Sequence, residues 1–353
     1  MLALAVLALG GSGALAQTGP FGLRIAGKAL VTLAGAPLRL LGVDRSGAEY
    51  MCVGRGDRTV FDGPTDAASI AAIVAWHANA VRVPLNEDCW LGINGADPWL
   101  SGVHYRRAVR RFVAALNAAG LYVILDLHWA APGRILATEQ WPMADADHAR
   151  AFWRSVARAF KGDRAVVFDL FNEPFISSWP CWRDGCETTF KDSAGQTVRY
   201  RTAGMQQLVE AVRSTGAGNS IMLGGLGYAS DESQWLRYEP RDPDHQLAVS
   251  FHTYNFSGCN DAACWNTTIA PLATQVPVVT GELGESGCTD GYVLGYMPWA
   301  DAHNISYLGW AWDATDSGWD CSSGPSLIED YAGTPTAYGV GLESHLASLA
   351  GGS

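Results

Sequence analysis

Residues 165–175 read AVVFDLFNEPF and predict the end of a buried strand. The segment from Val166 to Phe171 is almost continuously apolar, which is typical of a strand buried on both faces of a parallel sheet. It ends at Asn172, Glu173 and Pro174, and proline has no N–H to extend a ladder. Because an unpaired buried carboxylate is costly, we expect Glu173 to lie at the open end of the sheet or beside a partner. Alone, the stretch fits a strand-ending loop with a solvated glutamate equally well.

A second predicted strand ends in the same way, since residues 277–285 read PVVTGELGE. Val278 and Val279 lead toward Glu282, and the glycines on both sides of Glu282 let backbone and ligand approach it closely. Two carboxylates at two strand ends are the residue set of a glycosidase. A retaining enzyme of this kind holds an acid and an ionised nucleophile roughly 5 to 5.5 Å apart, and an inverting enzyme holds them further apart.

Eight such strands alternate with amphipathic helices after a short N-terminal hairpin over residues 23–25 and 29–33. The predicted strands cover residues 38–43, 80–85, 121–127, 220–223, 247–251 and 305–312, together with the two that lead to Glu173 and Glu282. Helical spacing predicts helices over 65–80, 104–119, 145–160 and 201–214. This alternation predicts one α/β domain over residues 17–353, a (β/α)8 TIM barrel with a short N-terminal β-hairpin. An open doubly wound sheet is the alternative.

Further polar side chains fall at or near the predicted strand ends, the face on which such barrels assemble active sites. Arg82 lies in the apolar strand AVRVPL, so its guanidinium needs a carboxylate partner. It would keep Glu282 ionised and aimed, or it would form a purely structural ion pair. Tyr254 would donate its O–H to the nucleophile, or it would simply pack in the barrel.

His128 and His252 each follow an apolar strand. A lone histidine there is more often a satisfied core residue, but the position of both relative to the two glutamates favours a supporting role in catalysis. Asn172 could donate to the 2-hydroxyl of a sugar, a bond that strengthens in the transition state, or serve only as a turn residue. The rival is a metal site built from His128, His148, His252 and acids. The chain has neither an H-x-H nor an H-E-x-x-H pair, so we expect no metal and no cofactor.

The chain holds 14 tryptophans, many of them in predicted loops. Flat indoles stack on the apolar faces of pyranose rings, so this abundance favours a sugar-binding cleft. We expect Trp312 beneath the sugar at the cleavage point. Trp310 is the alternative, because residues two apart in a strand point the same way. Trp129, directly after the third predicted strand, is a further candidate for substrate contact.

The start of the chain resembles a secretory signal. Residues 2–15 are apolar and small, and Ala14-Leu15-Ala16 has the form of a signal-peptidase site, although no Lys or Arg precedes the apolar core. A removed signal over residues 1–16 predicts a secreted protein; a disordered or buried segment is the alternative. No later stretch reaches the ~20 apolar residues of a membrane span. The net charge of −11 argues against nucleic acid or an anionic membrane as partner and favours a neutral substrate. We expect a monomer.

Eight cysteines in a secreted chain predict disulfides, and the absence of a C-x2-C pair argues against zinc. Short spacings predict two local bridges, Cys181 with Cys186 and Cys259 with Cys264. The other four cysteines each follow a predicted strand, so neighbouring loops favour two longer bridges, Cys52 with Cys89 and Cys288 with Cys321.

The order of these residues along the chain resembles glycoside hydrolase family 5, the cellulase-like family of clan A. That family carries an Arg on strand two, a His on strand three, Asn-Glu-Pro on strand four, a His and a Tyr on strand six, a Glu on strand seven and a Trp on strand eight. The matching residues here are Arg82, His128, Asn172, Glu173, Pro174, His252, Tyr254, Glu282 and Trp312. The resemblance covers nearly the whole chain after the signal. It implies a retaining β-glycosidase with Glu173 as acid/base and Glu282 as nucleophile.

Two features depart from the family pattern. Asp44 stands where such chains commonly have Asn, and residues 177–200 form a long insertion that could close one end of the cleft. The leading hypothesis is a secreted, retaining O-glycosyl hydrolase that cleaves internal bonds of a β-1,4-glucan, with a polysaccharide or oligosaccharide as substrate. An exo-acting β-glycosidase, or a mannanase or xylanase of the same fold, is the close alternative. A non-catalytic carbohydrate-binding barrel is the alternative of a different class.

Overall fold

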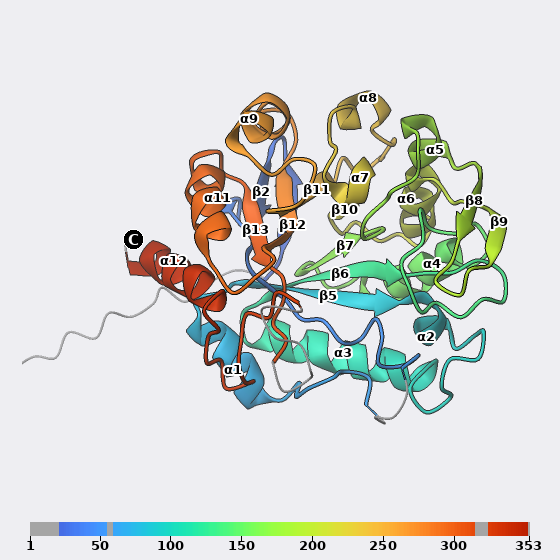
Figure 1. The fold of residues 1–353 in the computed structure, drawn as a ribbon, viewed down its shortest axis with the longest axis horizontal. Coiled ribbons are helices and arrows are strands. Elements are labelled where there is room, and N and C mark those ends of the chain that lie inside the picture. The colour runs from blue at the N-terminus through green and yellow to red at the C-terminus, as the bar shows by residue number, and fades with distance from the viewer. Residues whose placement is uncertain (1–20, 55–58, 315–323, 352–353) are drawn as a thin grey trace, which may run out of the picture.

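The computed structural model describes residues 21–54, 59–314 and 324–351, which form a closed barrel of eight parallel strands (Figure 1). In order around the barrel, the strands are β4 (Leu41–Asp44), β5 (Ala80–Asn86), β6 (Tyr122–Trp129), β7 (Val166–Asp169), β10 (Ile221–Gly224), β11 (Leu247–Tyr254), β12 (Val278–Gly284) and β13 (Ser306–Gly309). β13 pairs with β4 and closes the ring. The predicted (β/α)8 barrel is confirmed. The predicted signal over residues 1–16 lies outside the described residues.

The barrel strands are buried on both faces, as their apolar sequences predict. Every residue of β5, β7, β11 and β12 is buried. β7 ends earlier than its apolar run, but backbone hydrogen bonds from Leu170 to Met222 and from Asn172 to Leu127 continue its direction. Glu173 therefore still emerges at the carboxyl end of the barrel. The eighth strand is shorter than predicted, because it ends at Gly309.

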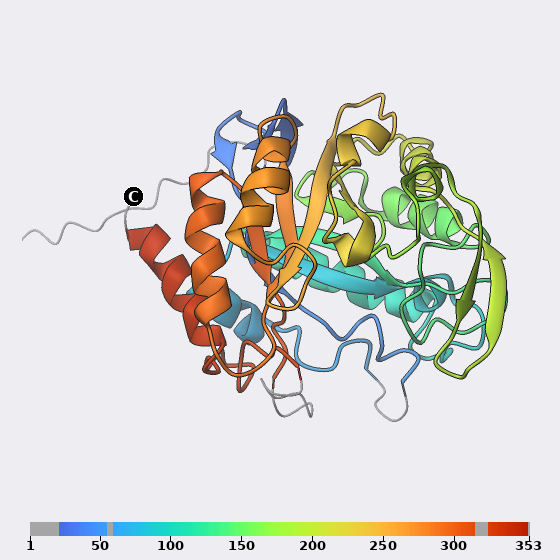
Figure 2. The same ribbon diagram turned by 45° about the horizontal axis from the view of Figure 1, so that its top comes forward.

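Helices cover the outside of the barrel (Figure 2). The longer ones are α1 (Ala67–Ala75), α3 (Val103–Ala118), α4 (Ala149–Phe160), α6 (Met205–Arg213), α11 (Gly291–Ala302) and α12 (Gly339–Gly351); the shorter ones are α2 (Glu87–Leu91), α5 (Trp179–Asp184), α7 (Leu226–Ala229), α8 (Trp235–Tyr238), α9 (Ala262–Cys264), the π-helix η1 (Trp265–Ile269) and α10 (Ala270–Ala273). Asp66 caps α1 by accepting from the backbone N–H groups of Ala68 and Ser69. Apolar residues three and four apart, such as Val109, Phe112 and Leu116 of α3, turn one helix face toward the barrel.

An antiparallel sheet of β1 (Leu23–Ala26), β2 (Ala29–Thr32) and β3 (Pro37–Leu38) extends the predicted N-terminal hairpin. Leu23, Ile25 and Leu30 pack in one apolar cluster with barrel residues that include Ile124 and Met222. This cluster covers one end of the barrel, so the opposite end, where the strands finish, is left for the site.

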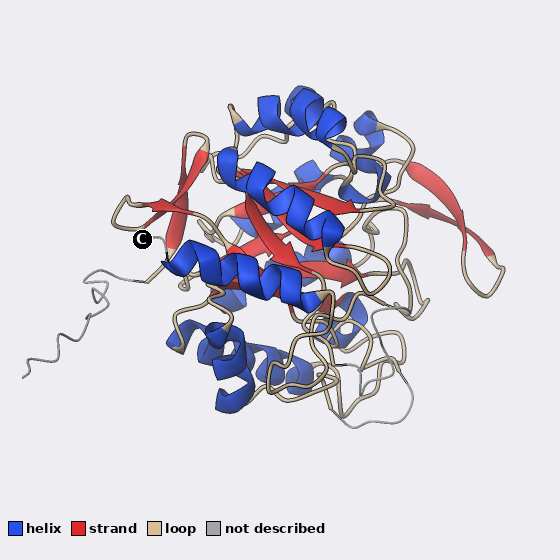
Figure 3. Cartoon of the chain, turned by 60° about the vertical axis from the view of Figure 1, so that its left-hand side comes forward, coloured by secondary structure: helices blue, strands red, loops and turns tan. Residues whose placement is uncertain are grey.

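The insertion forms α5 and an antiparallel ribbon of β8 (Glu187–Lys191) and β9 (Thr197–Arg201), which projects at the edge of the molecule (Figure 3). Three predicted disulfides are confirmed: Cys52–Cys89, Cys181–Cys186 and Cys259–Cys264. Cys288 is also disulfide-bonded, and its predicted partner Cys321 lies outside the described residues. None of the helices described is long and apolar enough to cross a membrane.

Candidate active site

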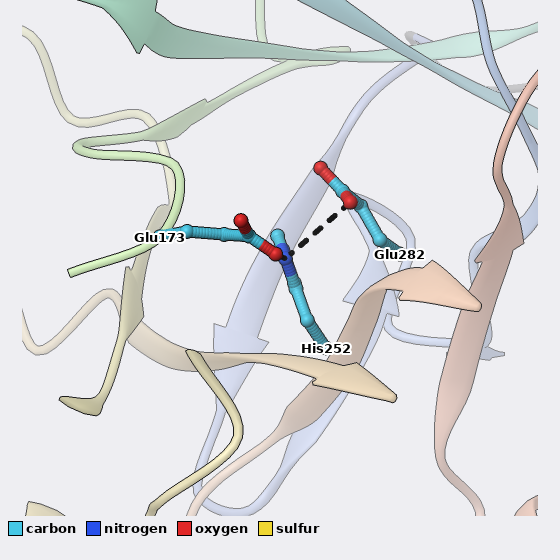
Figure 4. Close-up of side chains that lie close together, drawn as sticks. All are labelled: Glu173, His252 and Glu282. Carbon is cyan, nitrogen blue, oxygen red and sulfur yellow. Dashed lines mark hydrogen bonds and ion pairs between the residues drawn. The ribbon is translucent and has the colours of Figure 1, made fainter. Parts of the chain in front are cut away.

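Glu173 and Glu282 meet at the carboxyl end of the barrel, with His252 between them (Figure 4). A register shift in the ladder after Phe251 places His252 of β11 opposite Glu282 of β12. Nδ1 of His252 lies 3.1 Å from Oε1 of Glu173 and 3.6 Å from Oε2 of Glu282. One ligand atom from each of the three side chains lies within 4.8 Å of the others. The two strand ends singled out in the sequence therefore build a single site.

Glu282 is held by a donor on each carboxylate oxygen. Nη1 of Arg82 donates to Oε1 at 2.9 Å, and the phenol of Tyr254 donates to Oε2 at 2.6 Å. Glu282 exposes only 4% of its surface, so these bonds act with little competition from water. Charge-assisted donors favour the ionised form of a carboxylate and fix its direction.

Arg82 is the centre of a buried network that joins five strands or strand ends. Its five N–H donors are all used; besides Glu282, the acceptors are Asp44, Asp126, Asp169 and Asn172. The sequence predicted one carboxylate partner for Arg82, and the structure provides four. Asp126 and Asp169 were not predicted. A signal for both exists, because each is a lone aspartate inside an apolar strand, in LYVILDL and AVVFDLF.

One guanidinium cannot neutralise four carboxylates, and the aspartates respond differently. Burial raises the pKa of Asp44 well above its usual range and that of Asp169 to about 7. Burial also raises the pKa of Asp126, but the positive charge of Arg82 together with the charge and hydrogen bond of His128 outweighs it, so this pKa falls below its usual value. The network thus favours the protonated forms of Asp44 and Asp169. The positive charge of Arg82 is then balanced by Asp126 and Glu282.

Asn172 is oriented by the same network. Its Oδ1 accepts from Arg82 at 2.7 Å, so its Nδ2 faces Nε2 of His128 at 3.3 Å. Nδ1 of His128 contacts Asp126 at 2.9 Å. Burial lowers the pKa of His128, but Asp126 raises it, to about 9 on balance. An amide nitrogen can donate only to an unprotonated Nε2, so a hydrogen bond from Nδ2 of Asn172 to His128 forms only when the ring is neutral.

The two glutamates differ in environment. Burial raises the pKa of Glu173 to about 7, although His128 and Arg82 oppose the rise, so this carboxyl retains its proton to near-neutral pH. Burial lowers the pKa of His252 to about 3, and this imidazole is therefore neutral. Gln140 fixes the backbone of the first glutamate by donating to its carbonyl oxygen. A protonated carboxyl thus faces a carboxylate that is held by two donors.

The two predicted tryptophans have different surroundings, because the alternation of β13 stops at Gly309. Trp312 has no exposed surface and packs edge-to-face on Trp76 with ring centres 4.9 Å apart. The prediction that Trp312 stacks on the substrate is therefore wrong. Trp310, the alternative, is half-buried, lines the cleft and stacks on His128 with ring centres 5.3 Å apart.

The cleft consists of two adjoining hollows that share His128 and Trp310. One hollow encloses about 360 Å³ and is lined by Glu49, Tyr50 and Trp129, among others. The other encloses about 560 Å³ and contains both glutamates with Tyr228 and Phe256, which are 52% and 68% exposed. Trp129, the further candidate for substrate contact, lines the first hollow. Glu49, Tyr228 and Phe256 were not predicted, since no pattern in the sequence around them places them there.

The insertion does not close the cleft within the part of the chain that the structure describes. No residue of 177–200 lines either hollow. Phe190 of β8 packs on Phe175, and Phe175 stacks on Tyr228 with ring centres 4.8 Å apart. The insertion therefore supports an aromatic residue at the edge of the cleft, contrary to the expectation that it blocks one end.

Glu173, His252 and Glu282 could also ligate a cation, since their nearest N and O atoms lie close enough together. The predicted rival metal site would need His148 as well. His148 instead precedes α4 and contacts the carbonyl oxygen of Gly133 through Nε2. The described residues therefore do not bring the three histidines of that rival together.

Comparison with known proteins gives a consistent result. The sequence model of cellulase, glycosyl hydrolase family 5, matches residues 43–316. An endoglucanase of Microbulbifer sp. (strain ALW1) is 23% identical to this chain, and the match covers 67% of this chain and 41% of the endoglucanase. This chain spans about half the length of the curated relatives it matches. The structure is similar to a β-glucanase of Saccharophagus degradans, with a TM-score of 0.68 and 16% identity over 94% of each chain. An endo-β-1,4-glucanase of Xanthomonas axonopodis pv. citri gives a TM-score of 0.62 and 22% identity over 88% of this chain and 100% of its own.

Proposed function

The chain belongs to glycosyl hydrolase family 5, the cellulase family. From this membership and the geometry of the two glutamates, we propose that the protein is a retaining hydrolase that cleaves internal bonds of a β-1,4-glucan. Glu282 is the proposed nucleophile and Glu173 the proposed acid/base. No metal or other cofactor takes part in the proposed mechanism.

The retaining mechanism is supported by one observation, the proximity of the two carboxyl groups. An oxygen of Glu173 and an oxygen of Glu282 lie within 4.8 Å of one another. Retaining enzymes hold their carboxyl groups roughly 5 to 5.5 Å apart, whereas inverting enzymes need roughly 6.5 to 9.5 Å to admit a water molecule. The short separation favours direct attack by a carboxylate.

The assignment of roles follows from the surroundings of each side chain. The donors Arg82 and Tyr254 favour an ionised, correctly aimed Glu282. Burial raises the pKa of Glu173 to about 7, so this residue carries the proton that a leaving oxygen needs. His252 contacts Glu173 as a neutral ring and positions that carboxyl.

Catalysis then proceeds by two displacements at the anomeric carbon. In the first, an oxygen of Glu282 bonds to that carbon, the bond to the leaving oxygen breaks, and the proton of Glu173 passes to the leaving oxygen. In the second, Glu173, now a carboxylate, takes a proton from water as the water oxygen displaces Glu282. Both side chains return to their initial state, and the β-configuration is retained. Asn172 is positioned to donate to the 2-hydroxyl of the sugar in the transition state.

Internal cleavage of a β-glucan is supported by the shape of the cleft and by the named activities of the relatives. The hollow with Trp129 adjoins the hollow with Tyr228 and Phe256 at His128 and Trp310, and the second hollow contains both glutamates, so the cleft has room for more than one sugar unit. The relatives are named endoglucanases and β-glucanases. We also propose secretion, since the three described disulfides suit an oxidising compartment.

Azide rescue of two alanine variants tests the proposal. In Glu173→Ala, an activated aryl glycoside still forms the glycosyl-enzyme, but no base activates water; azide needs no base and should give the β-glycosyl azide. In Glu282→Ala, azide can attack only the substrate and should give the α-glycosyl azide. NMR of each adduct identifies the anomer.

Swapped anomers would reverse the two roles. Full activity of both variants without any adduct would refute the glycosidase mechanism. A product profile on soluble β-glucan, mannan and xylan then tests the substrate: early release of mixed oligosaccharides from β-glucan supports internal cleavage, and release of monosaccharide alone contradicts it.

A further inference from the structure

The helices α3 and α4 carry an unusual concentration of positive charge. The whole chain has a net charge of −11, yet these two helices contain no acidic residue. Their seven arginines are Arg106, Arg107, Arg110, Arg111, Arg150, Arg154 and Arg158. A groove of about 590 Å³ runs between the helices and is lined by five of them, Arg106, Arg107, Arg110, Arg111 and Arg158, together with Val103, Ser155 and small residues. We call this feature the arginine groove. It shares no lining residue with the cleft.

The spacing of the arginines works against the helices that carry them. Arg106 and Arg110 are four residues apart, as are Arg107 and Arg111, and α4 repeats the pattern at residues 150, 154 and 158. Residues four apart are neighbours on a helix surface, so each such pair sets like charges side by side, which destabilises the helix. No packing requirement explains the choice, because Arg107, Arg110, Arg111, Arg150 and Arg158 are exposed.

Within the part of the chain that the structure describes, no ion pair joins an arginine of the groove to an acidic residue. Among the described residues, the ion pairs of arginine involve seven others: Arg39, Arg45, Arg82, Arg183, Arg199, Arg201 and Arg213. Arg106 donates to the carbonyl oxygen of Trp90 at 2.6 Å. A row of guanidiniums without carboxylates is a site for an anion supplied from outside, since the planar guanidinium matches a carboxylate with two parallel hydrogen bonds.

An exposed tryptophan lies where the groove begins. Trp99 is 70% exposed, and its ring centre lies 6.3 Å from that of His104, the neighbour of the groove residue Val103. Val103 is itself 54% exposed. A free indole offers a flat apolar face to a pyranose ring, so the sugar and its carboxylate would each have a partner here. A membrane surface would need a broad apolar face, which one tryptophan and one valine do not supply.

We propose that the arginine groove is a second carbohydrate-binding site, which holds an acidic polysaccharide by its carboxylates. Residues 103 to 114 span about 16 Å of helix at 1.5 Å per residue, so more than one sugar unit can lie along the groove. The inference goes beyond the proposed function, because a neutral glucan has no group that pairs with arginine. The site would attach the enzyme to uronate-bearing polymers while the cleft acts on a glucan.

Binding of polygalacturonate, measured by calorimetry at low and at raised salt, tests the inference. The groove variant is Arg107→Gln, Arg110→Gln, Arg111→Gln and Arg158→Gln; the control variant, Arg199→Gln, Arg201→Gln, Arg237→Gln and Arg241→Gln, removes the same charge from exposed positions elsewhere. We expect the groove variant to bind about tenfold or more weakly, which is the loss of a few charge-assisted bonds, and the control to bind like the unmodified protein. Trp99→Ala should weaken binding severalfold without a change of charge. Raised salt should weaken binding of the unmodified protein.

Equal losses in the groove and control variants would refute a specific groove. The proposal would also be refuted if the protein did not bind polygalacturonate but bound duplex DNA or anionic vesicles through the same arginines, because the ligand of the groove would then belong to another class. Calorimetry needs no turnover and can be repeated in the Glu282→Ala background. Failure of this inference is thus distinct from failure of the proposed glucan hydrolysis, which is read from the activity of each variant on neutral β-glucan.

Discussion

Tyr254→Phe removes one hydrogen bond from the proposed nucleophile and little else. The phenol oxygen lies 2.6 Å from Oε2 of Glu282, and the ring packs against Phe256 with centres 5.1 Å apart. Phenylalanine retains that packing. Nδ1 of His252 lies 3.6 Å from Oε2, which is too long for a good hydrogen bond. Oε1 keeps its bond from Arg82.

The expected loss follows from the strength of that bond. A hydrogen bond to a charged group contributes about 1.5 to 3 kcal/mol. If the bond from Tyr254 holds Glu282 in position in the transition state, its loss should lower kcat/KM roughly 10- to 150-fold, since about 1.4 kcal/mol corresponds to a factor of ten.

The assay is kcat/KM against pH on a soluble β-glucan and an activated aryl glycoside, with thermal unfolding measured in parallel. Tyr292→Phe is the matched control, because its phenol contacts Thr253 rather than either glutamate, and it should leave kcat/KM unchanged. Activity of Tyr254→Phe within about threefold of the unmodified enzyme would refute the reasoning.

Four further expectations can be checked on the same preparations. Activity should follow a bell in pH, falling above about pH 7 as Glu173 loses its proton and falling at acid pH as the nucleophile gains one; a flat profile would contradict the pair. Trp310→Ala should lose activity with little change in melting temperature, whereas the buried Trp312→Ala should lose about 3 to 5 kcal/mol of stability; the reverse pattern would restore the original prediction. Burial raises the pKa of Glu49 from 4.5 to about 8, so the free energy of unfolding should decline as the pH rises between these values. Glu49→Gln should reduce the slope of this decline by up to about 1.4 kcal/mol per pH unit. An unchanged slope would count against this assignment. EDTA should leave turnover intact, and activity that EDTA removes and zinc or calcium restores would contradict a mechanism built on carboxylates alone.

Much of the candidate site could be read from the chain because it lies at strand ends. A polar residue after an apolar strand is visible in the sequence, and parallel strands bring their ends to one face of a barrel. Arg82, His128, Asn172, Glu173, His252, Tyr254 and Glu282 were found in this way, and the structure joins them through hydrogen bonds or close contacts.

Other residues could not be found, because nothing local distinguishes them. Glu49 and Phe256 lie in loops and Tyr228 in the four-residue helix α7, where no hydrophobic period indicates which side chains face the cleft. The error at Trp312 arose from extending the regular alternation of a strand beyond its last residue, Gly309, since alternation holds only while the strand continues.

The sequence by itself determined the barrel, its hairpin, two local disulfides and the pair of glutamates, because each depends on short-range pattern or on strand order. Only the tertiary structure decided how charge is distributed in the site. Arg82 joins Asp44, Asp126, Asp169 and Glu282 across five strands, and burial raises the pKa of Glu173 while two donors hold the other glutamate. The reason is physical: the protonation and direction of a carboxylate depend on desolvation and on donors within a few ångströms, and these come from segments that are distant along the chain.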